Sequence, residues 1–139
     1  MIRRYTAASL EAPDRLFQVT HVSRTHTQLF LQSNAAKSAG FEHRLEVWFQ
    51  SVQYFCMPFV LRGLSLRKAS QDERASLSEL HGLEADPRWD LYLLSRSHDW
   101  FIVSARPMWA EADLEYDDEP AFWSYAGQDD AVISMGTLE

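Results

Sequence analysis

The feature that most constrains the fold is a series of short β-rich runs, separated by turn residues and interrupted by a single helix signature. The clearest run spans 44–50, where two sets of residues alternate. The first set is Leu45, Val47 and Phe49, and the second is Glu46, Trp48 and Gln50. Because successive side chains of a strand point to opposite faces, the pattern predicts that the first set faces the core and the second faces outward.

Five further runs are rich in β-forming residues and are bounded by polar or turn-forming residues. They are 16–22, 27–32, 61–68, 89–95 and 100–106. The last two are separated by a short polar break, which predicts a hairpin. Because of Pro58, the apolar stretch 52–61 is predicted to be an edge strand, a bulge or an irregular segment. The first 14 residues suit a helix or a strand equally.

One helix is predicted at about 71–81. Ser70 and Glu73 have the spacing of a capping box, and Gly82 is a stop signal. Leu77 and Leu80 are expected to pack against the sheet. The predicted fold is therefore α+β, a mostly antiparallel sheet of about six strands with one helix on it, in a single domain of residues 1–139.

Charge is divided unevenly along the chain, whose net charge is −7. All 13 Lys and Arg residues lie at or before Arg106, together with 11 acidic residues, whereas nine acidic residues and no base follow. An acidic surface disfavours the binding of nucleic acid, because such binding depends mainly on contacts between Lys or Arg side chains and phosphates. It favours a basic protein partner, whose encounter it accelerates.

Several features favour a cytoplasmic protein without a membrane segment. The single cysteine, Cys56, excludes an intrachain disulfide. Two arginines near the N-terminus are not followed by the apolar region of a secretory signal. The longest apolar run, 54–61, is far shorter than the roughly 20 residues that a spanning helix needs.

The acidic segment 107–139 also carries aromatic residues, which are typical anchors of protein interfaces. The residues expected to bind a partner are Trp109, Glu111, Asp113, Glu115, Tyr116, Asp117, Asp118, Glu119 and Trp123. The alternative is a segment that packs its aromatics on its own sheet and leaves its acids in water. The two are compatible, because a docked segment can still present a face.

No residue pattern predicts catalysis, a cofactor or a metal site. The five histidines lack the partners of a zinc site, and Asp117–Glu119 do not have the spacing of an EF-hand loop. Ser95, Ser97, His98 and Asp99 are explained by a hairpin turn, because adjacency in sequence does not make a catalytic triad. Cys56 lies among apolar residues, which favours an inert thiol. We therefore expect no enzyme activity.

The runs Leu45-Glu46-Val47-Trp48-Phe49-Gln50-Ser51-Val52 and Leu61-Arg62-Gly63-Leu64-Ser65-Leu66, followed by a short helix, resemble small bacterial immunity proteins of polymorphic toxin systems. The later hairpin 91–105 resembles them too, and together these parts cover roughly half of the chain. The resemblance implies a protein that binds a toxin and blocks it by occlusion. It implies no functional residue in particular.

Two alternatives remain open. One is a small-molecule-binding protein or enzyme with a pocket between sheet and helix, whose walls would be Trp48, Tyr92 and Trp100. The other is a homodimer that pairs exposed strand edges.

Overall fold

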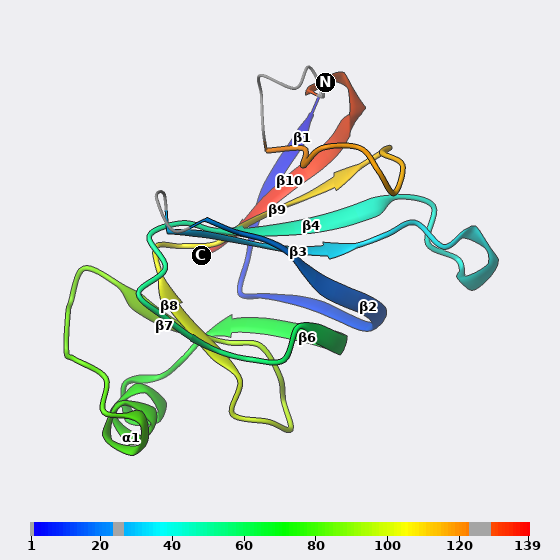
Figure 1. Cartoon of the computed structure of the whole chain (residues 1–139). Helices are drawn as coiled ribbons and strands as arrows, with labels where there is room; N and C mark the ends of the chain where they lie inside the picture. Colours follow the sequence, from blue (N-terminus) through cyan, green and yellow to red (C-terminus); the bar gives the residue numbers. More distant parts are fainter. Residues whose placement is uncertain (1, 24–26, 123–128) are drawn as a thin grey trace.

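The computed structural model of the chain describes residues 2–23, 27–122 and 129–139 (Figure 1). These residues form one mixed, mostly antiparallel sheet of ten strands, and within them lies the helix α1 (Gln71–His81). The strands are β1 (Arg3–Ala7), β2 (Ser9–Ser23), β3 (Gln28–Ser33), β4 (Arg44–Phe49), β5 (Tyr54–Cys56), β6 (Val60–Lys68), β7 (Asp90–Leu93), β8 (Phe101–Ser104), β9 (Met108–Ala112) and β10 (Val132–Leu138). Two short 3-10 helices are η1 (Lys37–Ala39) and η3 (Asp129–Ala131). The α+β class is confirmed, but the expectation of about six strands is wrong.

The long strand β2 determines the shape of the sheet. The strand order is β1-β10-β9-β4-β3-β2-β6-β7-β8-β5, and only the β1–β10 pair is parallel. The register of β2 shifts between Ala12 and Leu16 against β6, and between Val19 and His21 against β3. Such irregularities bend a strand and increase its twist. Figure 1 shows the two halves of the sheet diverging from β2.

One large core lies on the inner face of this bent sheet. Leu45, Val47 and Phe49 of β4 are buried there, as their alternation predicts. They pack with residues of both halves of the sheet, among them Phe17, Leu61 and Trp109. The apolar residues of strands that are distant in sequence therefore meet only because the sheet folds over along β2.

The helix covers the outer face of β7 and β8, where Leu77 is buried with Leu91 and Phe101. Its predicted bounds are confirmed, and its capping box forms between Ser70 and Glu73. The prediction for Leu80 is wrong, because its side chain is 71% exposed. A helix of 11 residues presents only a narrow stripe to one hairpin, and Leu80 lies outside that stripe.

Beyond the six predicted runs, the sheet contains β1, β5, β9 and β10. β5 falls in the stretch 52–61, for which an edge strand was one expected alternative, and β1 falls in the first 14 residues, which were left open between helix and strand. β1 and β5 are the two edges of the sheet, and an edge strand needs no apolar alternation. The hairpin of β7 and β8 is confirmed. β9 lies outside this hairpin and pairs with β4 and β10. The segment 107–139 is thus partly built into the sheet.

A glycine allows two aromatic side chains to meet across three strands. Gly136 of β10 lies directly between Tyr5 of β1 and Trp109 of β9. The Trp109 indole Nε1 donates a 2.7 Å hydrogen bond to the Tyr5 hydroxyl. A Cβ atom at position 136 would stand 2.3 Å from that Nε1, so the indole occupies the space that any other residue would need.

We expect Gly136→Ala to destabilise the protein by about 1–3 kcal/mol, because the added methyl group forces the buried indole to move. Urea unfolding followed by circular dichroism measures this change. Ser134→Ala, a small change on the same strand, is the control and should stay within about 0.5 kcal/mol. Equal stability of the two variants would contradict this account of the Tyr5–Trp109 contact.

The capping box of α1 predicts a pH dependence of stability. Arg67 donates to the Glu73 carboxylate at 2.7 and 2.8 Å, and the Ser70 backbone N–H donates at 2.9 Å. These bonds, that from Arg67 first, lower the pKa of Glu73 to about 2 from its ordinary 4.5. Ionised Glu73 therefore stabilises the fold above pH 4.5, and the contribution is lost as the pH falls toward 2.

We expect Glu73→Gln to lower the free energy of unfolding near pH 7 by about 1 kcal/mol, since the pair is partly exposed to solvent. The gap between this variant and the unmodified protein should shrink as the pH falls from 4.5 toward 2. Urea titrations at several pH values measure it. A gap that does not change with pH would show that the Glu73 charge is not involved.

Candidate functional site

The acidic residues after β9 are arranged on a tight turn. We call residues 113–119 the acidic turn. The Asp118 backbone N–H donates to the Glu115 carbonyl at 3.1 Å, which closes a β-turn with Tyr116 and Asp117 at its tip. The Asp118 carboxylate accepts a second bond, 2.7 Å long, from the Glu115 N–H. The turn therefore has a defined backbone and does not trail as an extended tail.

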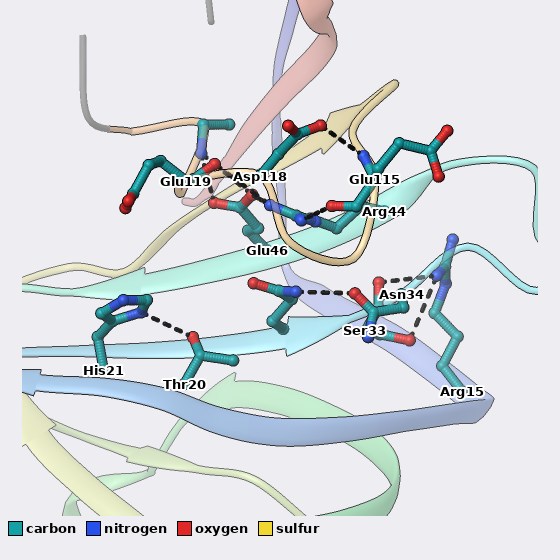
Figure 2. A network of polar contacts seen from close by, with 12 residues as sticks. Arg15, Thr20, His21, Ser33, Asn34, Arg44, Glu46, Glu115, Asp118 and Glu119 are labelled. Carbon is teal, nitrogen blue, oxygen red and sulfur yellow. Dashed lines mark hydrogen bonds and ion pairs between the residues drawn. The ribbon is translucent and has the colours of Figure 1, made fainter. Parts of the chain in front are cut away.

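A buried ion pair on β4 holds this turn against the sheet. Arg44 and Glu46 are 0% and 1% exposed, and their charged groups meet at 3.1 Å. Arg44 also donates to the backbone carbonyls of Glu115 and Glu119. The Ala121 N–H donates to both oxygens of the Glu46 carboxylate, at 2.8 and 3.1 Å. The pair thus binds the backbone on both sides of the turn (Figure 2).

The prediction that Glu46 faces solvent is wrong. Its strand face points away from the main core, as expected, but the segment 114–122 covers it. Leu114 and Ala121 of that segment are buried against Ala112. Burial raises the pKa of the Glu46 carboxyl group, and the bonds from Arg44 and Ala121 oppose this effect. β4 is therefore buried on both of its faces along much of its length.

The carboxylates of the acidic turn lie on the outside. Figure 2 shows the Glu115 and Glu119 side chains extending away from the Arg44 guanidinium, which donates to the backbone carbonyls of both residues. The Tyr116 side chain is 78% exposed. The exposed residues predicted to bind a partner are Asp113, Glu115, Tyr116, Asp117, Asp118 and Glu119. The structure brings these six together.

Two of the predicted partner-binding residues lie elsewhere. Trp109 is 1% exposed and belongs to the main core, so it offers no surface to a partner. Glu111 is paired in register with Leu45, which places both on the inner face of the sheet. Burial lowers the pKa of Arg15, and the nearby charge of Glu111 opposes this effect. Trp123 lies outside the described residues.

The three aromatics proposed as pocket walls do not form one pocket. Trp48 stacks between Phe30 and Phe122, with ring centroids 6.0 and 5.0 Å away. Tyr92 is a core residue, and burial raises its pKa to about 12. A hollow of about 360 Å³ does lie beside the helix, but it is lined by other residues: Asp72, Glu73, Ser76, Leu77, Leu80, Leu93 and Asp99.

Trp100 lines a different cavity, of about 460 Å³, which we call the polar pocket. It lies between β6 and the connection that joins β7 to β8. Its lining residues are Glu11, Pro13, Val60, 62–65, 94–98 and Trp100. The sequence pattern did not indicate this pocket, because its walls come from three separate parts of the chain. Of its lining residues, the sequence indicated Trp100 as a pocket wall, and Ser95, Ser97 and His98 as part of a hairpin turn.

The serine and histidine residues of that connection form a turn, in agreement with the prediction. The Ser95 hydroxyl accepts from the backbone N–H groups of Ser97 and His98 at 3.1 and 3.2 Å. Within the described residues, no group of three His, Cys, Asp or Glu side chains is placed to hold a metal ion. No helix of the described part is both long and apolar enough to span a membrane.

Comparison with known proteins adds no assignment. No protein-family model, no curated protein and no solved structure matches this chain.

The Arg44–Glu46 pair can be tested with a double-mutant cycle. Arg44→Met should cost about 3–5 kcal/mol, because it leaves the Glu46 carboxylate buried without its counter-charge. Arg44→Met combined with Glu46→Leu should cost clearly less than the two single changes added together. Urea unfolding gives the free energies, and hydrogen exchange at the Ala121 N–H reports on the turn. Additive costs with unchanged exchange would contradict the role of the pair.

Proposed function

We propose that this protein is a non-enzymatic, cytoplasmic binding protein that recognises a basic protein partner through the acidic turn. By the resemblance to immunity proteins of polymorphic toxin systems, the partner would be a toxin and the mechanism would be steric occlusion. The observation that carries the proposal is the buried Arg44–Glu46 pair, which fixes the backbone of an exposed acidic turn.

The energetics of the ion pair support a binding role for the turn. Burying two charges costs free energy that the pair only partly recovers. Here Arg44 donates to the backbone carbonyls of Glu115 and Glu119. Glu46 accepts from the Ala121 N–H, whereas the Arg44 Nε is buried without a hydrogen-bond partner among the described residues. A turn that is already ordered loses little conformational entropy when a partner binds. The fold thus supplies a preorganised surface element instead of a loose acidic tail.

The composition of the turn supports a basic protein as the partner. Tyr116 is an exposed aromatic side chain at the tip of the turn, and tyrosine is enriched among residues that dominate interface energies. The flanking carboxylates of Glu115 and Asp117 are exposed and provide a negative rim. Such a rim attracts cationic surfaces, orients them and disfavours acidic ones.

The test compares two variants of equal net charge. Glu115→Gln with Asp117→Asn removes two charges from the acidic turn, and Glu79→Gln with Glu84→Gln removes two from the region of α1. Each changes the net charge from −7 to −5. Partners captured from an extract of the source cells are identified, purified and titrated against each variant by calorimetry at low and high salt.

We expect the turn variant to bind its partner about tenfold more weakly and the α1 variant to bind normally. Affinity for the unmodified protein should fall as salt rises, because exposed charges are screened. Tyr116→Ala should also weaken binding without changing the salt dependence. Equal weakening by both charge variants, or binding that salt does not affect, would refute the proposed site.

A further inference from the structure

The polar pocket arises where two neighbouring strands separate. β6 pairs with β7 only at Arg67 and Lys68, and one further backbone bond joins the Ser65 N–H to the Leu94 carbonyl at 3.1 Å. Toward Val60, β6 stays paired with β2, while the opposite side is formed by the connection 95–100. Buried Leu64 and Leu94 lie at the base of this opening.

A bulge in β2 shapes one wall of the pocket. Residues 13–15 of β2 stand opposite Gly63 alone, because Ala12 pairs with Leu64 and Leu16 pairs with Arg62. Gly63 adopts a φ of +90°, and a Cβ atom there would lie 2.8 Å from the Pro13 carbonyl oxygen. Only glycine suits this close approach. Bulges of this kind are frequent beside binding and active sites.

A flat stacked pair forms another wall. The His98 ring lies on the Trp100 ring with centroids 4.2 Å apart and planes 9° from parallel. The two bonds to the Ser95 hydroxyl fix the turn that carries His98, and the Ser97 hydroxyl contacts His98 Nδ1 at 3.1 Å. This surface is therefore held in place before any ligand arrives, and flat aromatic surfaces favour stacking with planar rings.

The charged side chains that line the pocket give it a net positive charge. The Glu11 carboxylate accepts from Arg96 at 2.7 Å and from the Ser65 hydroxyl at 2.9 Å, so Glu11 and Arg96 compensate each other. Arg62 also lines the pocket and is exposed. In the described part of the chain, Arg62 forms no ion pair. The pocket thus carries a positive charge on a protein whose net charge is −7.

We propose that the polar pocket binds a small organic anion with a planar ring, the ring packing against the stacked His98–Trp100 pair and the anionic group pairing with Arg62. The pocket volume of about 460 Å³ is within the range of sites for small molecules, roughly 300–1,000 Å³. Aromatic carboxylates and nucleoside monophosphates share this chemistry. The site is separate from the acidic turn and does not depend on the proposed partner.

The probes separate the contribution of the ring from that of the charge, and they distinguish an aromatic carboxylate from a nucleoside monophosphate. Indole-3-acetate and adenosine 5′-monophosphate carry both features, indole and adenosine carry only the ring, and acetate and inorganic phosphate carry only the charge. Titrations followed by ¹H–¹⁵N NMR report on the Gly63 and Ser97 amides and on the Trp100 indole N–H. Residues of the acidic turn serve as reference signals that should not shift.

We expect one of the two complete probes to shift the pocket signals and to bind about tenfold more tightly than its ring or its anion alone. Arg62→Gln should weaken that binding about tenfold, and His98→Ala should weaken the ring-only probe as well. Arg88→Gln, an exposed arginine outside the pocket, is the matched control and should bind normally. The proposal is overturned if no probe binds at millimolar concentration, if Arg62→Gln and Arg88→Gln behave alike, or if the neutral ring binds as tightly as the anion.

Discussion

The buried Arg44–Glu46 pair is the constraint on which the arrangement of the segment between β9 and β10 depends. Two charges removed from water must find partners. Here each binds the other and the backbone of the segment that covers them. Residues 75 positions apart are thereby joined, and β9 and β10 lie on either side of the covering segment in the chain. Loss of either charge should loosen this whole region.

The second organising feature is the bent strand β2. Its two irregularities let one sheet enclose a core between its halves, and the first irregularity also forms a wall of the polar pocket. The acidic turn and the pocket are supported by different elements, β4 with β9 for the turn and β2 with β6 for the pocket. They are separate surfaces of opposite charge.

Local sequence signals predicted the elements whose stability is local. The capping box marked the beginning of α1 and Gly82 marked its end, and alternation marked the inner face of β4. The hairpin of β7 and β8 followed from two β-rich runs and a short break. For β1 and β5 the sequence left alternatives open, a helix or a strand for β1 and an edge strand, a bulge or an irregular segment for β5, since an edge strand lacks a second buried neighbour that would impose an apolar pattern. The sequence pattern did not predict β10, because Gly136 is a weak strand former. The position is nevertheless glycine, because the Trp109 indole fills the space that a Cβ atom would need.

The sequence by itself determined the division of charge, with every base at or before Arg106, and it placed Tyr116 among consecutive acids. It could not determine which of those residues are exposed. Trp109 is buried and Tyr116 is exposed because β9 joins the sheet and the following turn is bound by Arg44. Contacts between residues so distant in sequence leave no local pattern, so only the folded chain decides whether Glu46 meets water or Arg44, and whether β6 and its neighbours leave a pocket.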